Sequence, residues 1–141
     1  MPLTTNMYLA DAILNLLKGV AIATPISIRI ALTTTIPVRS DTNTTLVRTT
    51  YPGYTDIIIT SGQWSNIVEN LNNGSIMTTI SNINFPNVSS TPSPVSIIVG
   101  FAILDNNDNI YYQGSLSTPL IINTNGQIVE IPSGALTITE N

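Results

Sequence analysis

The run of aspartate and asparagine at residues 105–109 is the stretch whose side chains most resemble a metal site. Oxygen atoms at its first, third and fifth positions would suit Ca²⁺, which prefers carboxylate and carbonyl ligands. The match ends there, because Ile110 stands where a calcium loop requires glycine and Leu116 where it requires a bidentate glutamate. A solvated hairpin tip explains the same residues, so we expect no metal site.

The sequence lacks the side chains that most often carry out catalysis. The chain has no histidine and no cysteine, which removes the commonest general base and every thiolate nucleophile. Hydroxyls are plentiful, but nothing is placed to activate them, and the only lysine, Lys18, is expected at a helix end. Four carboxylates could in principle pair, yet their spacing indicates no shared site: Asp56, Glu69, Asp105 and Glu130. We predict no enzymatic activity and no cofactor.

Charged residues are scarce, making up 9% of 141 residues with a formal net charge of −4. The four basic residues form no stripe that could neutralise phosphates, which argues against nucleic-acid binding. No apolar run reaches the roughly 18 residues of a membrane span, and no basic region precedes residues 9–22, so we expect neither a membrane segment nor a cleaved leader. An uncharged Thr, Asn and Ser surface suits contact with identical neighbours, although the host's codon usage explains it equally well.

The first nineteen residues have a helical pattern. Apolar residues recur at Leu9, Ile13, Leu16 and Leu17, which places them on one helical face. We expect Thr4 or Thr5 to cap the helix, Lys18 to lie in its last turn and Gly19 to end it. Residues 1–19 are therefore predicted to form an N-terminal helix or arm.

From residue 20 onward the apolar period changes to two, which is typical of strands. The expected strands are 26–32, 57–60, 64–68, 76–80, 83–85, 95–104, 110–113, 120–122, 127–131 and 135–139, and the expected loops are 33–50 and 87–94. Fold-determining turn positions are expected at Gly53, Gly100, Pro119, Gly126, Pro132 and Gly134. The pattern predicts one domain over residues 20–141, an all-β antiparallel sandwich or jelly-roll-like fold.

The aromatic residues allow two interpretations. Trp64, Tyr51, Tyr54, Tyr111 and Tyr112 could line a carbohydrate-binding face, because aromatic rings are a common platform for sugars. The alternative, which we favour, places Trp64, Phe85 and Phe101 in the core and the tyrosines half-buried at strand ends or at an interface.

Seven residues are candidate contacts to partner subunits. A helix ahead of a sandwich and a long polar loop at 33–50 are natural docking elements, and they point to seven residues: Leu9, Ile13, Leu16, Leu17, Arg48, Tyr51 and Tyr54. Arg48 has a second possible role, because it could anchor the loop to a carboxylate or simply lie in solvent.

The C-terminal third carries an ordered set of short motifs. They are Val99-Gly-Phe-Ala-Ile-Leu-Asp105, Tyr112-Gln-Gly114, Leu116-Ser-Thr-Pro119, Asn125-Gly126 and Ile131-Pro-Ser-Gly-Ala-Leu-Thr-Ile138. In this order they resemble a widespread group of small tailed-phage virion proteins, often labelled tail-fibre-like. The chain departs from that group after Tyr54, where Thr55 and Asp56 replace an arginine that is often present.

The resemblance implies a structural component of the phage virion. Within that class we expect a capsid cement or decoration protein, because no long fibre or coiled-coil segment is present. We expect it to form a symmetric oligomer, with a trimer as the favoured state, and to contact other virion proteins such as the major capsid protein. A tail-tip or fibre-adaptor subunit is the first alternative, and a carbohydrate-binding adhesion module is the second.

Overall fold

The computed structural model describes residues 3–72 and 74–140 and confirms the predicted fold class, with one short helix followed by antiparallel sheets. The elements are β1 (Leu3–Thr5), α1 (Met7–Leu16), β2 (Ile28–Thr33), β3 (Ile57–Ile59), the short 3-10 helix η1 (Ser61–Gln63), β4 (Val68–Asn70), β5 (Gly74–Thr78), β6 (Ile83–Phe85), β7 (Ser96–Asp105), β8 (Ile110–Ile122), β9 (Val129–Ile131) and β10 (Thr137–Glu140). Residues 1, 2, 73 and 141 lie outside the described part of the chain.

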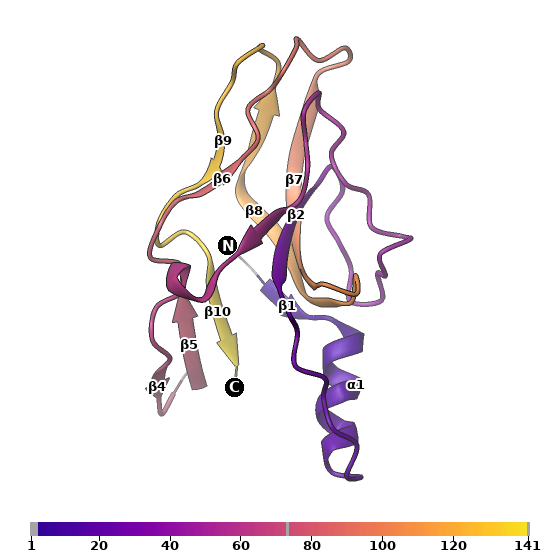
Figure 1. Cartoon of the computed structure of the whole chain (residues 1–141), viewed down its shortest axis with the longest axis vertical. Helices are drawn as coiled ribbons and strands as arrows, with labels where there is room; N and C mark the ends of the chain where they lie inside the picture. The colour runs from indigo at the N-terminus through magenta and orange to yellow at the C-terminus, as the bar shows by residue number, and fades with distance from the viewer. Residues whose placement is uncertain (1–2, 73, 141) are drawn as a thin grey trace.

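The strands of the described residues form three sheets (Figure 1). The largest has the order β1-β8-β7-β2-β3, and it is faced by the pair β6-β9 and by the three-stranded sheet β10-β5-β4. The segment expected to be a free N-terminal arm starts as an edge strand, because β1 pairs with β8 through Leu3 and Gly114. At the lower end of the view, α1 and the β10-β5-β4 sheet project from the body.

The main core lies between the five-stranded sheet and the two smaller sheets. Alternate residues of β2 and β7 point into it, among them the fully buried Ile30, Leu32 and Phe101. The facing layer contributes Ile83, Phe85, Val88, Val129, Ile131, Leu136 and Ile138. This alternation explains why period-two patterning locates β2 and β7 correctly, since burial on a sheet face selects every second residue.

The loop at 34–50 covers the opposite face of the five-stranded sheet. Leu46 packs there with Ala31, Ala102, Leu104 and Ile110 in a second buried cluster. Backbone hydrogen bonds from Thr34 to Val47 and from Thr49 to Leu32 tie the loop along β2. β7 is therefore buried on both faces, which matches its near-continuous run of apolar residues.

Gly100 is not at a turn, contrary to the prediction, and lies in the middle of β7 at an irregularity in its register with β8. A Cβ atom added there would lie 2.6 Å from Pro37 Cδ, 2.7 Å from Thr33 Oγ1 and 2.9 Å from the Gly114 carbonyl oxygen. The position requires glycine because neighbouring atoms approach its backbone closely, and not because of its dihedral angles.

Positive φ angles are found at three of the predicted turn glycines, Gly53, Gly126 and Gly134. Of the two prolines predicted at turns, Pro119 lies inside β8 and is not at a turn. Pro132 directly follows β9 and begins a turn, because the Ala135 amide donates to its carbonyl oxygen. Pro119 is tolerated because it falls where the β7–β8 ladder is exposed and out of regular register. The arms expected at 110–113 and 120–122 are consequently one strand.

Candidate interaction surface

The clearest candidate for an interaction surface is the helical arm, which we define as α1 and the residues 17–27 that return to β2. Of the predicted contact residues on α1, only Leu9 is buried, at 8% exposure. Ile13, Leu16 and Leu17 are exposed, and so is Leu14 at 61%. The amphipathic face predicted from the sequence therefore exists, but apart from Leu9 its large side chains meet solvent rather than the domain's own core.

Asn6 holds the base of the helical arm. Its Oδ1 accepts a hydrogen bond from the Tyr8 amide at 2.9 Å, which caps the helix. Its Nδ2 donates to the Asp41 carbonyl oxygen and to Gln113 Oε1, both at 3.0 Å. The predicted caps, Thr4 and Thr5, are wrong, because both residues belong to β1 and pair with β8. Asn6 satisfies the same requirement one residue later.

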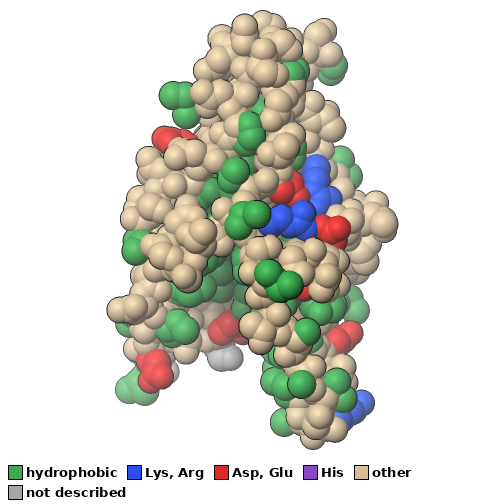
Figure 2. All heavy atoms as spheres, viewed as in Figure 1, with side chains coloured by type: hydrophobic (Ala, Val, Ile, Leu, Met, Phe, Trp, Pro, Cys, Tyr) green, Lys and Arg blue, Asp and Glu red, His purple; other side chains and the backbone are tan. Residues whose placement is uncertain are grey.

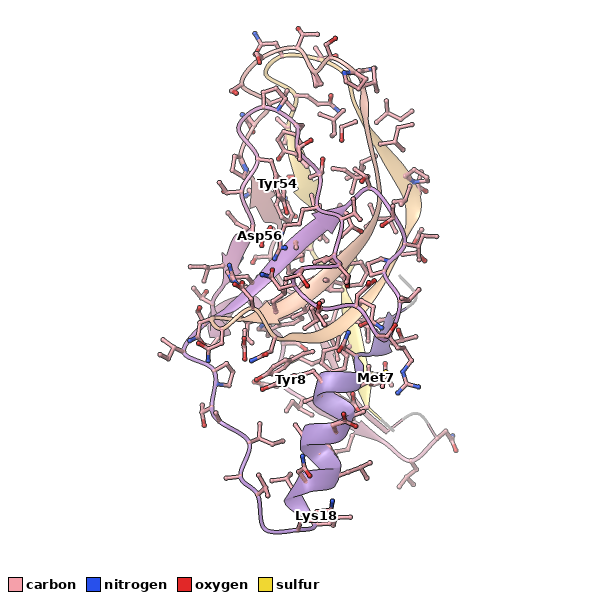
Figure 3. All side chains as sticks on the ribbon, turned by 90° about the vertical axis from the view of Figure 1, so that its right-hand side faces the viewer. Met7, Tyr8, Lys18, Tyr54 and Asp56 are labelled. Atoms are coloured by element: carbon pink, nitrogen blue, oxygen red, sulfur yellow. The ribbon has the colours of Figure 1, made fainter. Side chains whose placement is uncertain are left out.

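The contacts around Asn6 fix the start of α1 to the sheet. Gln113 is fully buried and donates from Nε2 to Thr4 Oγ1 at 2.7 Å. The Tyr8 ring stacks on Tyr111 of β8 with ring centroids 5.8 Å apart. The Met7 amide also donates to the Arg39 carbonyl oxygen. The helical arm is thus attached at the end where Met7 and Tyr8 lie, while its other end, marked by Lys18, lies away from the body (Figure 3).

The far end of the helical arm carries Lys18. The helix ends at Leu16, so Lys18 lies beyond the last turn, and the prediction that placed it within that turn is wrong. Gly19 has a φ of +79°, the left-handed conformation expected at the end of a helix. On the returning segment Val20 and Ile26 are also exposed. The Ile26 amide donates to Asn106 Oδ1 at the tip of the β7–β8 hairpin.

Three other predicted contact residues lie within the body instead. Tyr51 is buried at 2% exposure, and its hydroxyl donates to the Pro86 carbonyl oxygen at 2.8 Å. Tyr54 Oη accepts from the Leu32 amide and donates to Asp56 Oδ1 at 2.7 Å. Arg48 pairs with Asp56 at 3.0 Å. These residues anchor the 34–56 segment to β2. Tyr51 is enclosed in the core, and the hydroxyl of the half-buried Tyr54 is already bonded within the chain.

Burial changes the acidity of these tyrosines. It raises the pKa of Tyr51 to about 12. The pKa of Tyr54 is raised from its ordinary value, first by burial and then by the hydrogen bond to Asp56. Each phenol is therefore held as a neutral hydrogen-bonding group, and this arrangement supports the fold rather than a reaction.

The aromatic residues considered for sugar binding do not share one face. Tyr51 lies in the core and contacts Tyr54 edge to face, while Tyr54 and Trp64 are partly buried and pack against the same core. Tyr111 stacks on Tyr8, while Tyr112 donates from its hydroxyl to Glu140 Oε1 at 2.7 Å. This distribution matches the core-and-interface alternative and gives no flat aromatic platform among the described residues.

The hairpin tip at 105–109 uses its carboxylate internally. Asp105 Oδ1 accepts from the Asn107 and Asn109 amides, at 2.8 and 2.9 Å, and Oδ2 accepts from Asn109 Nδ2. Asp108 pairs with Arg29 of β2. Within residues 3–72 and 74–140, no group of three or more carboxylates is arranged to hold a metal ion. In that same part of the chain, no helix has the length and hydropathy to cross a bilayer.

A second exposed apolar region is not evident from the sequence. The three-stranded arm, which we define as the β10-β5-β4 sheet with residues 67, 71 and 72, exposes Ile67, Val68 and Leu71. The pattern predicts a strand at residues 64–68, but β4 begins only at Val68 and is a short edge strand. The sequence offers one indication that Ile67 and Val68 are exposed, because the polar residues Asn66 and Glu69 flank them on both sides. Hydrophobic side chains lie on both projecting arms and in the hollow between them (Figure 2).

Comparison with known proteins gives one family. A family model described as "Podophage GP4 fiber I protein gp80" matches residues 4–139, nearly the whole chain. No curated protein matches the sequence.

Proposed function

The chain belongs to the family of the podophage GP4 fiber I protein gp80, and from this premise we propose that it is a tail-fibre subunit that assembles through the helical arm. Family membership confirms the resemblance seen in the C-terminal motifs. It makes the chain a virion structural protein of the tail-fibre type. The capsid-cement role expected from the sequence finds no support in this family, and the fibre alternative fits better.

The observation that carries the proposal is the exposed apolar face of α1. Leu14 and Leu17 are exposed at 61% and 86%, on a helix whose base is held by buried hydrogen bonds. An isolated helix of about ten residues is marginally stable in water, so burial against a partner would stabilise it. Full burial of one leucine side chain contributes roughly 1.5–3 kcal/mol, and several residues of this kind form an interface core.

The proposed partners are copies of the same chain and other virion proteins. A surface with few charges favours such contacts, because fewer ionic groups must be desolvated on assembly. Avidity across a symmetric assembly then multiplies individually weak contacts. The trimer expected from the resemblance stays a prediction that sedimentation of the assembled protein can check.

The proposal is tested by the double substitution Leu14→Asp and Leu17→Asp in full-length protein. We expect an unchanged urea midpoint but at least about tenfold fewer copies incorporated into particles, because interface anchors are replaced by charge. The matched control is Ile36→Asp with Val38→Asp, two exposed apolar residues on the 34–50 loop. Equal incorporation of the arm variant and the wild type, measured by quantitative mass spectrometry of purified particles, would contradict the proposal.

A further inference from the structure

The inner face of the three-stranded arm combines an apolar floor with two carboxylates. In the sheet register, Glu69 of β4 and Glu140 of β10 both lie directly opposite Ser75 of β5. The three side chains therefore form one row on the same face. Met77 lies two residues from Ser75 and shares that face with Ile138. The face therefore presents aliphatic and thioether groups bordered by negative charge.

This face opens into a hollow of about 180 Å³. It is lined by Ile67, Ser75, Ile76, Met77, Tyr112, Ile138 and Glu140. Glu140 Oε1 accepts from Tyr112 at 2.7 Å and from Thr5 Oγ1 at 3.2 Å, which holds the carboxylate at the edge of the apolar floor. The hollow is thus suited to an apolar segment that carries one positive charge.

The helical arm supplies such a segment. Arg29 pairs with Asp108 and Arg48 with Asp56, while Arg39 donates from Nε to the Thr5 carbonyl oxygen. The side-chain ammonium of Lys18, by contrast, makes no ion pair or hydrogen bond within the described part of the chain. Lys18 lies at the tip of the arm, and the exposed Leu14 and Leu17 precede it (Figure 3).

We propose that the helical arm of one copy docks on the inner face of the three-stranded arm of a second copy, with Lys18 against Glu69 and Glu140. The inference rests on the proposed function and adds the partner surface to it. Charge complementarity favours this partner: the basic tip of the helical arm meets the acidic edge of the apolar hollow. Contact between two helical arms with their tips together would instead bring two lysines into proximity.

The contact joins two different surfaces, so each copy offers one donor arm and one acceptor face. Such an interface either closes into a ring or continues as a filament, and both outcomes suit a fibre component. Each interface would bury Leu14 and Leu17 beside Ile67 and Met77, while the charged pair would set the register. Substitution of the charges should therefore alter pairing without removing the apolar contact.

The test uses two single charge reversals, Lys18→Glu and Glu69→Lys, in full-length protein. Both positions are exposed, so each variant is expected to fold, and Glu140 is left in place because it accepts two hydrogen bonds. Sedimentation velocity over a concentration series should show self-association of the wild type. Each variant alone should associate about tenfold more weakly, because like charges then face each other.

An equimolar mixture of the two variants provides the decisive comparison. In the mixture, the carboxylate introduced at position 18 of one variant meets the ammonium introduced at position 69 of the other. Opposite charges then face each other at positions 18 and 69, and Lys18 of the Glu69→Lys variant meets the unaltered Glu69 of the Lys18→Glu variant. Association in the mixture should therefore exceed that of either variant alone.

Three results would each overturn the inference. They are a wild type that stays monomeric throughout, single variants that associate like the wild type, and a mixture no stronger than its components. Loss of incorporation in the Leu14/Leu17 variant alongside any of these results would leave the proposed function standing and reject only this partner surface.

Discussion

Helix α1 and strand β7 are both ten residues long and rich in apolar residues, yet they place those residues differently. The last six residues of β7, from Gly100 to Asp105, are all buried, because sheets or loops cover both of its faces. In α1 only Leu9 among the helix residues is buried. The contrast shows that apolar pattern alone specifies an element but not the surface that will cover it. For β7 that surface is within the chain, and for α1 we propose that it is another subunit.

The largest difference between the two regions should appear in stability. Phe101→Ala removes a fully buried side chain of β7 and should lower the free energy of unfolding by about 3–5 kcal/mol. Leu14→Ala in α1 should change it by no more than about 0.5 kcal/mol, since Leu14 is exposed. Urea denaturation of both variants measures the contrast, which would be lost if Leu14→Ala destabilised the chain as strongly.

Gly100 tests how tightly β7 is enclosed. Gly100→Ala should lower the free energy of unfolding by roughly 1–3 kcal/mol, because the new methyl group would overlap Pro37, Thr33 and the Gly114 carbonyl. Gly62→Ala is the matched control, since no atom lies within 4 Å of an added Cβ there. Equal thermal midpoints for these two variants would show that the strand can move to make room.

The Tyr54 hydroxyl links β2 to the 34–56 segment. Tyr54→Phe should destabilise the chain by about 1–3 kcal/mol, because the Leu32 amide and the Asp56 carboxylate each lose a partner. Tyr8→Phe keeps the ring that stacks on Tyr111 and removes only the hydroxyl of a 39% exposed side chain, so it should change stability by no more than about 0.5 kcal/mol. Chemical denaturation of the two variants at neutral pH gives the comparison. Equal losses in the free energy of unfolding would show that the hydrogen bonds of the Tyr54 hydroxyl do not stabilise the fold.

The buried tyrosines also predict loss of stability at alkaline pH. Burial raises the pKa of Tyr51 to about 12 and also raises the pKa of Tyr54 and Tyr112. Below the ordinary tyrosine pKa of about 10 the phenols are protonated in both states, so they add no pH dependence. As pH rises from about 10 toward about 12 the unfolded chain releases protons that the folded chain retains, so stability should fall. Denaturation curves across that interval that showed no decline would contradict this expectation.

A smaller effect is expected at the base of the helical arm. Asn6→Ala removes the helix cap and should cost about 0.5–2 kcal/mol, much of it as fraying of α1. Asn6→Ser keeps a capping oxygen but removes the bonds to Asp41 and Gln113, so it separates capping from anchoring. Far-ultraviolet circular dichroism measures the helix content, and an unchanged spectrum in Asn6→Ala would show that the anchor is dispensable.

The fold class can be predicted from the sequence because patterning is a local signal. The helix over residues 7–16 and the central strand β7 both follow from the pattern, and the boundaries differ by only a few residues. The change of period near residue 20 and the positive-φ glycines at Gly126 and Gly134 are visible in one chain without any partner. These features depend on neighbours close in sequence, which is why they are predictable.

Other features depend on contacts between distant segments. Tyr51 and Tyr54 are expected from the sequence to be half-buried at strand ends or at an interface. Tyr51 is instead fully enclosed in the core, and Tyr54 stacks on Phe85 of β6. Gly100 resembles a turn glycine, and only its proximity to Pro37 and Gly114 shows the steric reason for it. The acidic row of Glu69 and Glu140 joins segments far apart in sequence and follows from the register of β5 with both neighbours. Such pairings are set by tertiary structure and have no local signature.

The account depends most directly on the claim that α1 is exposed in the free subunit and covered in the assembled fibre. Hydrogen–deuterium exchange of residues 9–18 should be measured in dilute monomer and in purified particles. We expect rapid exchange in the monomer, where the helix has few buried contacts, and strong protection in the particle. Equal exchange rates in the two states would contradict the claim that this helix is the assembly surface.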